Sequence, residues 1–120
     1  MADVLGVFEQ AVLVAVAHLR GEGYGRTILK DVQERLGREV AASAAYATLD
    51  RLEGKGLVAS RDGESTPARG GRAKRHFTIT AQGVRALAAA KAANENIWRG
   101  FVLPHPPTRF ALRWTGKGRA

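Results

Sequence analysis

Residues 43–58 read SAAYATLDRLEGKGLV, and this segment gives the strongest indication of the architecture. Apolar side chains recur within it at helical spacing, at Ala45, Leu49 and Leu52. The spacing predicts a helix from about Ser43 to Glu53, with Ser43 as its N-cap and the glycines at 54 and 56 ending it.

A second amphipathic helix is predicted upstream, from about Arg26 to Leu36, and Gly37 ends it. Two short helices a few residues apart, each apolar on one side, are typical of a helix-turn-helix. Further upstream, residues 6–20 predict a helix whose apolar positions are almost continuous. Such a helix is buried on several sides, and in so small a chain we favour a subunit interface as the reason.

Two short strands are predicted downstream, at residues 57–61 and 75–79. The segment between them, residues 62–74, contains glycines, a proline and several basic residues, and is predicted to be a loop. A helix-turn-helix followed by a hairpin with a basic tip is the layout of a winged helix. The predicted fold class is therefore mainly α with a small β-hairpin.

The rest of the chain is expected to form one more helix and a tail. Thr80 is predicted to cap a helix from Ala81 to about Trp98, and no later element covers its apolar side. We therefore expect this helix to form a dimer interface with the first one. The chain divides into a winged helix-turn-helix domain (1–79), a C-terminal dimerisation helix (80–99) and a basic, proline-containing tail (100–120).

Charge is distributed unevenly along the chain. Its 120 residues carry 19 Lys and Arg against 11 Asp and Glu, a net charge of +8. Residues 1–60 are close to neutral, with 7 basic and 8 acidic side chains, so residues 61–120 hold the whole excess. A basic excess placed in this way favours a polyanionic partner, either nucleic acid or an anionic membrane surface.

Several other classes of protein are disfavoured. The chain has no cysteine, its longest apolar run (residues 11–17) is far shorter than the ~20 residues of a membrane span, and no signal-peptide pattern opens it. We therefore expect a cytoplasmic protein. The three histidines lack metal-ligand spacing, and neither a nucleophile elbow nor a phosphate-binding loop is present. The sequence thus predicts a protein that is not an enzyme and that uses no metal or cofactor.

The predicted winged helix offers two sets of side chains to double-stranded DNA. The second helix of the motif enters the major groove, where small or polar side chains let it approach the bases, and the wing supplies cations to phosphates. The helix offers Ser43, Ala44, Ala47 and Arg51. The hairpin offers Arg61, Arg69, Arg72, Lys74 and Arg75.

Three candidates in or next to the helix have a second interpretation. The guanidinium of Arg51 suits O6 and N7 of guanine, or it forms an ordinary helix salt bridge. Tyr46 contacts a phosphate, or it packs beneath the wing. Lys55 contacts DNA, or it satisfies the last carbonyl groups of the helix.

Four segments of the chain, taken in order, resemble the PadR family of bacterial winged-helix regulators, specifically its short-tailed members. They are residues 9–13 (EQAVL), 24–28 (YGRTI), 46–58 (YATLDRLEGKGLV) and 74–83 (KRHFTITAQG). The third is similar to the family's L-Y-x-x-L-x-R-L-E-x-x-G-L-[IV] segment, and the fourth to its K-R-x-[YF]-x-[IL]-T-x-x-G segment. Ala45 stands where the family usually has Leu, and His76 where Tyr is frequent.

The resemblance implies a homodimer built from the first and last helices. It also implies a transcriptional repressor that recognises a palindromic operator. Some relatives bind a flat aromatic molecule at the dimer interface against an aromatic side chain of the last helix; Trp98 lies near that position, or it packs in the core or against the tail. Two other functions remain open: a winged helix that binds an acidic protein, and a membrane-surface adaptor that works through the basic tail.

Overall fold

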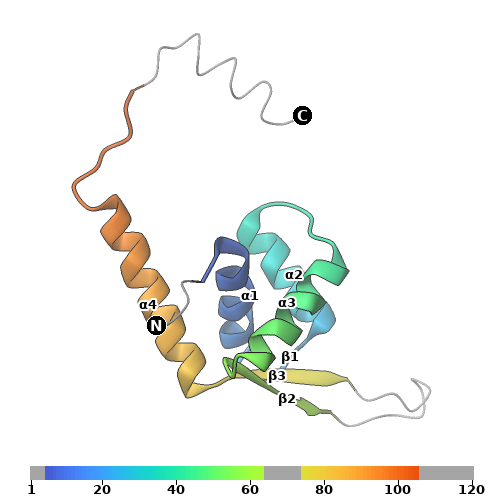
Figure 1. Cartoon of the computed structure of the whole chain (residues 1–120). Coiled ribbons are helices and arrows are strands. Elements are labelled where there is room, and N and C mark those ends of the chain that lie inside the picture. Colours follow the sequence, from blue (N-terminus) through green and yellow to red (C-terminus); the bar gives the residue numbers. More distant parts are fainter. Residues whose placement is uncertain (1–4, 64–73, 106–120) are drawn as a thin grey trace.

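The chain folds into a winged helix-turn-helix followed by one long helix (Figure 1). The computed structural model describes residues 5–63 and 74–105. The elements in chain order are α1 (Val7–His18), β1 (Gly23–Tyr24), α2 (Gly25–Leu36), α3 (Ala42–Gly54), β2 (Val58–Asp62), β3 (Arg75–Ile79) and α4 (Ala81–Trp98). The predicted fold class is confirmed.

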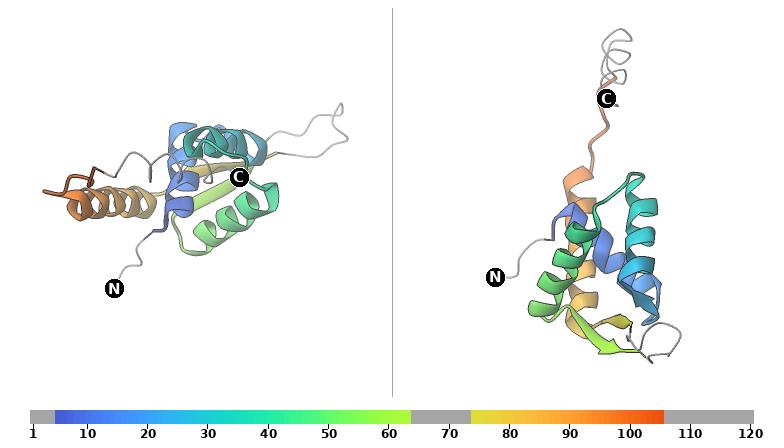
Figure 2. Two further views of the ribbon diagram at one scale, coloured as in Figure 1. Left: turned by 90° about the horizontal axis from the view of Figure 1, so that it is seen from above. Right: turned by 90° about the vertical axis from the view of Figure 1, so that its right-hand side faces the viewer.

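α1 lies at the centre of the core, with α2, α3, β3 and α4 packed around it (Figures 1 and 2). Its fully or nearly fully buried side chains are Ala11, Val12, Leu13, Ala15 and Val16. The expectation that a subunit interface explains the apolar character of this helix is wrong for these residues. Four elements of the same chain surround α1, so its apolar middle is buried without a second copy, whereas Val7 at its start is 73% exposed.

α2 and α3 form the helix-turn-helix. α2 ends as predicted at Gly37, whose φ of +69° lies in the left-handed region that glycine adopts most easily. α3 begins one residue earlier than predicted, and its N-cap is Ala41 instead of Ser43. The Ala41 carbonyl accepts the amide hydrogens of Ala44 and Ala45, which places Ser43 inside the first turn.

The sheet has the order β1-β3-β2 and is antiparallel throughout. β2 and β3 form the predicted hairpin, paired from Val58 opposite Ile79 to Asp62 opposite Arg75. The third strand, β1, was not predicted, because two residues are too few to show the alternation that identifies a strand. Gly23 of β1 pairs with Phe77, and this pairing fixes the hairpin beside the start of α2.

α4 is anchored at its N-terminal end. The Thr80 hydroxyl accepts the amide hydrogen of Gly83 at 3.0 Å, as the predicted cap requires. Gly83 and Ala90 are buried, and the Asn94 amide donates to Gln10 of α1 at 3.1 Å. One side of the first part of the helix is therefore covered within the chain, whereas Val84 is 54% exposed.

The C-terminal end of α4 extends past α1 and away from the body of the domain (Figure 2). Ile97 continues the face that holds Ala90, yet it is 72% exposed, and Trp98 is 54% exposed. This end of α4 thus carries an apolar surface without cover among the described residues. Within those residues, no helix combines the length and the apolar character that crossing a membrane requires.

Candidate nucleic-acid interface

The outer face of α3 is composed of small side chains. Ala45, Leu49 and Leu52 are buried, together with Thr48 beside them, so helical spacing turns the other side of α3 outward. Ser43, Ala44 and Ala47, which the sequence selected, are all exposed there. A helix with so few bulky side chains on its outer face can approach a groove of DNA closely.

Asp50 lies on the same outer face and was not selected from the sequence. Its side chain is 70% exposed, and one carboxylate oxygen lies 3.7 Å from Nη1 of Arg75. A carboxylate at this place can accept a hydrogen bond from N4 of cytosine. It also repels phosphate, so it favours contact with base edges over contact with the DNA backbone.

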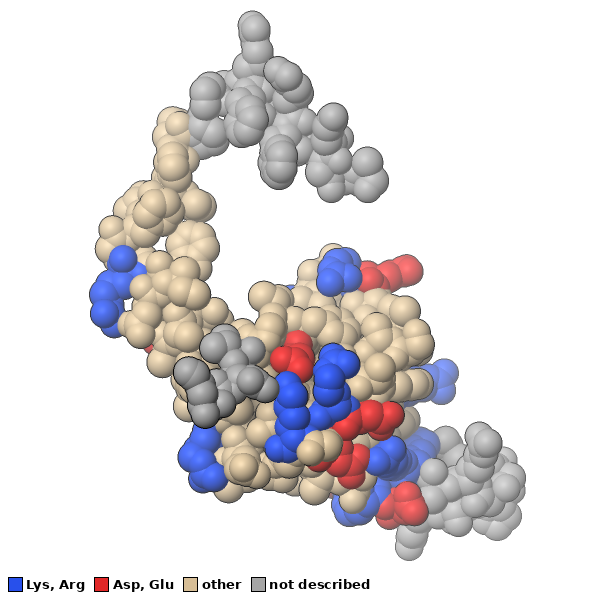
Figure 3. Space-filling view, viewed as in Figure 1, with Lys and Arg blue, Asp and Glu red and all other residues tan. Residues whose placement is uncertain are grey.

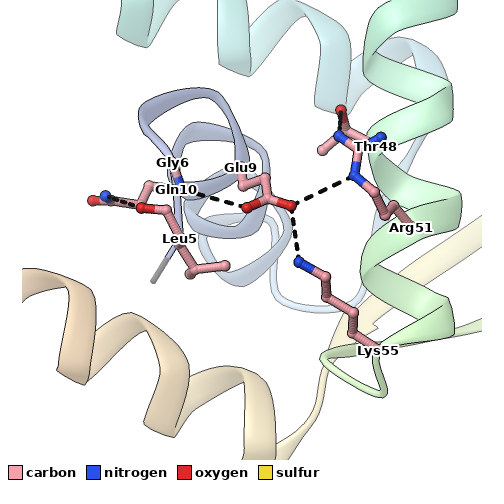
Figure 4. A network of polar contacts seen from close by, with 7 residues as sticks. All are labelled: Leu5, Gly6, Glu9, Gln10, Thr48, Arg51 and Lys55. Carbon is pink, nitrogen blue, oxygen red and sulfur yellow. Dashed lines mark hydrogen bonds and ion pairs between the residues drawn. The ribbon is translucent and has the colours of Figure 1, made fainter. Parts of the chain in front are cut away.

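Arg51 lies on the flank of α3 that faces α1 (Figure 4). Its Nε atom is 3.5 Å from Oε2 of Glu9, and its Nη2 atom donates to the hydroxyl of the buried Thr48 at 3.1 Å. In the protein without DNA, Arg51 therefore forms a salt bridge. The pair joins two helices and is not internal to α3.

Lys55 follows α3, and its side chain extends toward the carboxylate of Glu9, which also contacts Arg51 (Figure 4). Its Nζ atom donates to Oε2 of Glu9 at 3.1 Å. The contact with Glu9 is an interaction that neither sequence-based interpretation of Lys55 included. One oxygen of Glu9 thus contacts two cations, one within α3 and one just after it.

Glu9 is held on its other side by the chain itself. Its Oε1 atom accepts the amide hydrogen of Gly6 at 3.3 Å, and the side chain is only 17% exposed. Burial raises the pKa of Glu9, but the hydrogen bonds from Lys55 and Gly6, with the nearby charges, outweigh burial and leave this pKa below its ordinary value. Glu9 is therefore an anion at neutral pH.

Arg75 of β3 lies on the opposite flank of α3. Its guanidinium forms an ion pair with Glu53 and donates from Nε to the Ser60 hydroxyl at 3.1 Å. The Ser60 hydroxyl in turn donates to Glu53 at 2.7 Å. The hairpin is thus tied to the end of α3, and a predicted DNA-contacting cation is engaged by a carboxylate here too.

A groove of about 400 Å³ opens between α3, the start of α2 and the hairpin. Its polar and aromatic lining includes Tyr24, Arg26, Tyr46, Asp50, Lys74 and Arg75. Tyr46 lies directly over Gly25, where a Cβ atom would come within 2.7 Å of the Tyr46 ring. Tyr46 is 45% exposed, so it packs against the start of α2 and still presents a surface to the groove.

Lys74 and Tyr24 form one side of this groove. The ammonium of Lys74 lies 4.1 Å from the centre of the Tyr24 ring, a cation–π contact that keeps its positive charge and leaves its side away from the ring open to an anion. Arg26 of α2 is exposed nearby in the same lining. The groove therefore combines cations with aromatic rings, a combination suited to a phosphodiester backbone.

The remaining predicted residues are not all in one place. Arg61 is exposed on β2 and donates to the Gly21 carbonyl at 3.2 Å. Arg69 and Arg72 lie outside the described residues. Trp98 lies at the end of α4, 6.1 Å between ring centres from Phe101, and it does not line the groove.

Basic and acidic side chains alternate over α3 and the hairpin instead of forming a uniform basic surface (Figure 3). Three predicted cations contact carboxylates: Arg51, Lys55 and Arg75. Among the described residues, no three His, Cys, Asp or Glu side chains gather as a metal site would require.

Besides Asp50, three further functional candidates were not identified from the sequence. Arg26 and Tyr24 were visible only as part of the Y-G segment at the start of α2, which the resemblance uses without assigning a role. Glu9 gave no signal of its own, because 42 or more residues separate it from its partners along the chain.

Comparison with known proteins identifies the family to which this fold is related. The model of the PadR-like family of transcriptional regulators matches residues 12–89, which is more than half of the chain. A PadR family regulator from Eggerthella lenta is 25% identical, with a TM-score of 0.61 over 74% of this chain and 75% of that one.

Two further solved structures share the fold. A PadR family regulator from Clostridium difficile is 22% identical, with a TM-score of 0.59 over 96% of this chain and 100% of that one. RosR from H. salinarum is 21% identical, with a TM-score of 0.62 over 99% of this chain and 96% of that one. No functionally curated protein matches the chain. The family model and the winged helix together show that this chain belongs to the PadR-like family and is a DNA-binding transcriptional regulator, not an enzyme.

Proposed function

We propose that the protein is a sequence-specific repressor that acts in the cytoplasm as a homodimer on a palindromic operator. The observation that carries this proposal is the outer face of α3, where Ser43, Ala44 and Ala47 leave the helix free of bulk and a cationic groove lies at its side. In a winged helix this is the geometry that lets the second helix of the motif enter the major groove.

The contacts with DNA divide into two kinds. Bases are read from the outer face of α3, where Asp50 suits N4 of cytosine and Arg51 can extend toward guanine. Phosphates are held at the groove, by Lys74 and Arg26 with the hydroxyl of Tyr46, and by the basic hairpin. Phosphate contacts set affinity and register, whereas base contacts set sequence preference.

Dimerisation is assigned to α4. Because the middle of α1 is buried inside the chain, the exposed apolar residues at the C-terminal end of α4, Ile97 and Trp98, offer the main surface that a second copy would bury. A two-fold dimer places its α3 helices about one helical turn of DNA apart, ~34 Å, and this spacing requires a palindromic site. A flat aromatic effector that binds beside Trp98 at this interface would change the spacing and release the DNA.

The proposal is tested by fluorescence anisotropy with the duplex upstream of the protein's own gene and a scrambled duplex of equal length, over a series of salt concentrations. We expect a preference of ~10³ or more for the native duplex at physiological salt. Weak and equal binding to both duplexes would contradict a specific operator at that locus and favour the protein-interaction alternative. Vesicle binding that disappears when residues 100–120 are deleted would favour the membrane-surface alternative.

A further inference from the structure

Each flank of the outer face of α3 carries a carboxylate that contacts the cations of that face. On the α1 side, Glu9 contacts Arg51 and Lys55. On the hairpin side, Glu53 contacts Arg75. These three cations are among the side chains predicted to contact DNA, so the free protein already supplies anions to them.

Glu9 is positioned independently of its cations. It lies in the first turn of α1, where its Oε1 atom accepts the Gly6 amide hydrogen, and α1 is fixed in the core. Its Oε2 atom is directed toward Lys55 and Arg51 (Figure 4). The carboxylate therefore stays in place when a cation leaves it.

Glu53 is fixed in a comparable way on the other flank. One of its oxygens accepts the Ser60 hydroxyl hydrogen at 2.7 Å, and the other accepts from Arg75. Ser60 belongs to β2, so this contact joins the end of α3 to the hairpin. Both carboxylates are thus anchored by a neutral hydrogen-bond donor and leave one oxygen for a cation.

The cations themselves remain partly exposed. The side chains of Arg51, Arg75 and Lys55 are 53%, 48% and 33% exposed. Pairs with this much exposure contribute little to folding, ~0–1 kcal/mol each. A DNA phosphate that reaches one of these cations, however, must compete with the carboxylate or lie close to it, so the carboxylates act mainly against binding of the DNA backbone.

We propose that Glu9 and Glu53 are internal counter-anions that hold Arg51, Lys55 and Arg75 away from phosphates, and so suppress non-specific DNA binding. On the operator, base contacts along α3 offset the free energy lost when these ion pairs break. On other sequences those base contacts are not made, so the loss is not offset. The two glutamates therefore raise the preference for the operator by weakening its competitors. This inference rests on the proposed DNA-binding function and adds positioning residues to it.

If Glu9 is a counter-anion, removing its charge should raise affinity for non-specific DNA. If its role were purely structural, the same substitution should lower affinity. In Glu9→Gln the amide oxygen still accepts the Gly6 amide hydrogen, but the two cations lose their anion. We expect one or two additional phosphate contacts, which steepen the slope of log K against log salt by about 0.9 for each contact. Affinity for a scrambled duplex at physiological salt should rise on the order of 5- to 30-fold.

The experiment measures anisotropy of the full-length chain with a scrambled duplex across a salt series. The variants are Glu9→Gln, Glu53→Gln and, as the control, Glu34→Gln. Glu34 is exposed on α2 and outside both clusters, so its substitution makes the same change in net charge. The double variant Glu9→Gln/Lys55→Gln removes one of the two released cations. Its slope should therefore show only about half of the increase that Glu9→Gln alone produces.

Tighter binding of Glu9→Gln and Glu53→Gln than of the control, with steeper slopes, supports the inference. Binding and slopes equal to those of Glu34→Gln, or weaker binding on every duplex, would overturn it. If Glu9→Gln fails to fold by circular dichroism, Glu53→Gln decides the same question from the other flank. The preference of the wild type for native over scrambled duplex is read separately, so failure of the proposed operator is distinguishable from failure of this inference.

Discussion

At the scale of single residues, the decisive feature is that one carboxylate contacts both a cation of α3 and the cation that follows this helix. Glu9 comes from the first helix and contacts Arg51 and Lys55 in partly exposed ion pairs, where α1 faces α3 (Figure 4). The same residues therefore serve the free protein as an interhelical contact and the complex as candidate DNA ligands.

Replacing Arg51 with alanine tests its role in base reading. We expect Arg51→Ala to weaken binding to the operator by ~1–3 kcal/mol and to relax sequence choice at one base pair. Affinity for a scrambled duplex should change much less, because the Arg51 guanidinium is already paired with Glu9 in the free protein. Competition binding with single-base operator variants measures the effect, and equal losses on operator and scrambled DNA would contradict the assignment.

The lowered pKa of Glu9 predicts how its contribution to stability depends on pH. A carboxyl whose pKa is lower in the folded chain than in the unfolded chain stabilises the fold above its unfolded pKa, about 4.3 for glutamate. This contribution is lost as the pH falls through the lower, folded value. Urea denaturation of wild type and Glu9→Gln should therefore give a difference in unfolding free energy that is largest above pH ~5 and shrinks under acid. A difference that stays constant between neutral and acidic pH would show that the charge of Glu9 contributes nothing.

At the scale of elements, the hairpin and α4 are joined through one close approach. Gly83 in the first turn of α4 lies against the carbonyl of Leu57, just before β2. Thr80 also donates to the Gly56 carbonyl at 2.7 Å and caps α4. The direction in which α4 leaves the domain is set by this junction.

Adding a single methyl group at Gly83 should loosen that junction. A Cβ atom at this position would overlap the Leu57 carbonyl oxygen and the Ile79 side chain, so the backbone must shift. We expect Gly83→Ala to lower the free energy of unfolding by ~1–3 kcal/mol, as overpacking does elsewhere. Chemical denaturation measures this change. Gly54→Ala is the matched control, because a Cβ atom there meets no atom within 4 Å, and similar losses in the two variants would contradict the steric explanation.

At the scale of the whole molecule, the chain is a compact winged helix from which the end of α4 extends (Figure 2). Most of the exposed large apolar side chains of the described residues lie at that end or just after it: Ile97, Trp98, Phe101, Val102 and Leu103. Val7 and Val84 are exposed elsewhere. Apolar surface of this kind is typical of an interface between proteins. We assign it to the second copy of the proposed dimer.

Charging this surface should separate the two copies. We expect Ile97→Asp to shift the protein from dimer to monomer in analytical ultracentrifugation, because a carboxylate cannot be buried there without a partner. The circular dichroism spectrum should remain that of the wild type, since Ile97 is 72% exposed and packs little within its own chain. Affinity for a palindromic operator should fall with the loss of the second half-site. A variant that stays dimeric would place the interface elsewhere, and a monomeric wild type would contradict the proposed dimer.

Much of the fold was determined by the sequence itself. Helical spacing at Ala45, Leu49 and Leu52 gave α3 within one or two residues, and alternation gave β3 with its observed ends. Gly37 and Thr80 marked a helix end and a helix start correctly. These features are local. Side-chain periodicity and capping depend on residues within a few positions of one another, so both can be identified from the sequence.

Only the tertiary structure decided which side chains meet. It surrounded α1 with four elements of the same chain, added β1 to the hairpin, and brought Glu9 to Arg51 and Lys55. It also revealed that Asp50 shares the outer face of α3 with the small residues that the sequence selected. The physical reason is that packing joins segments 40 or more residues apart. No spacing along the chain records which charges those segments bring together.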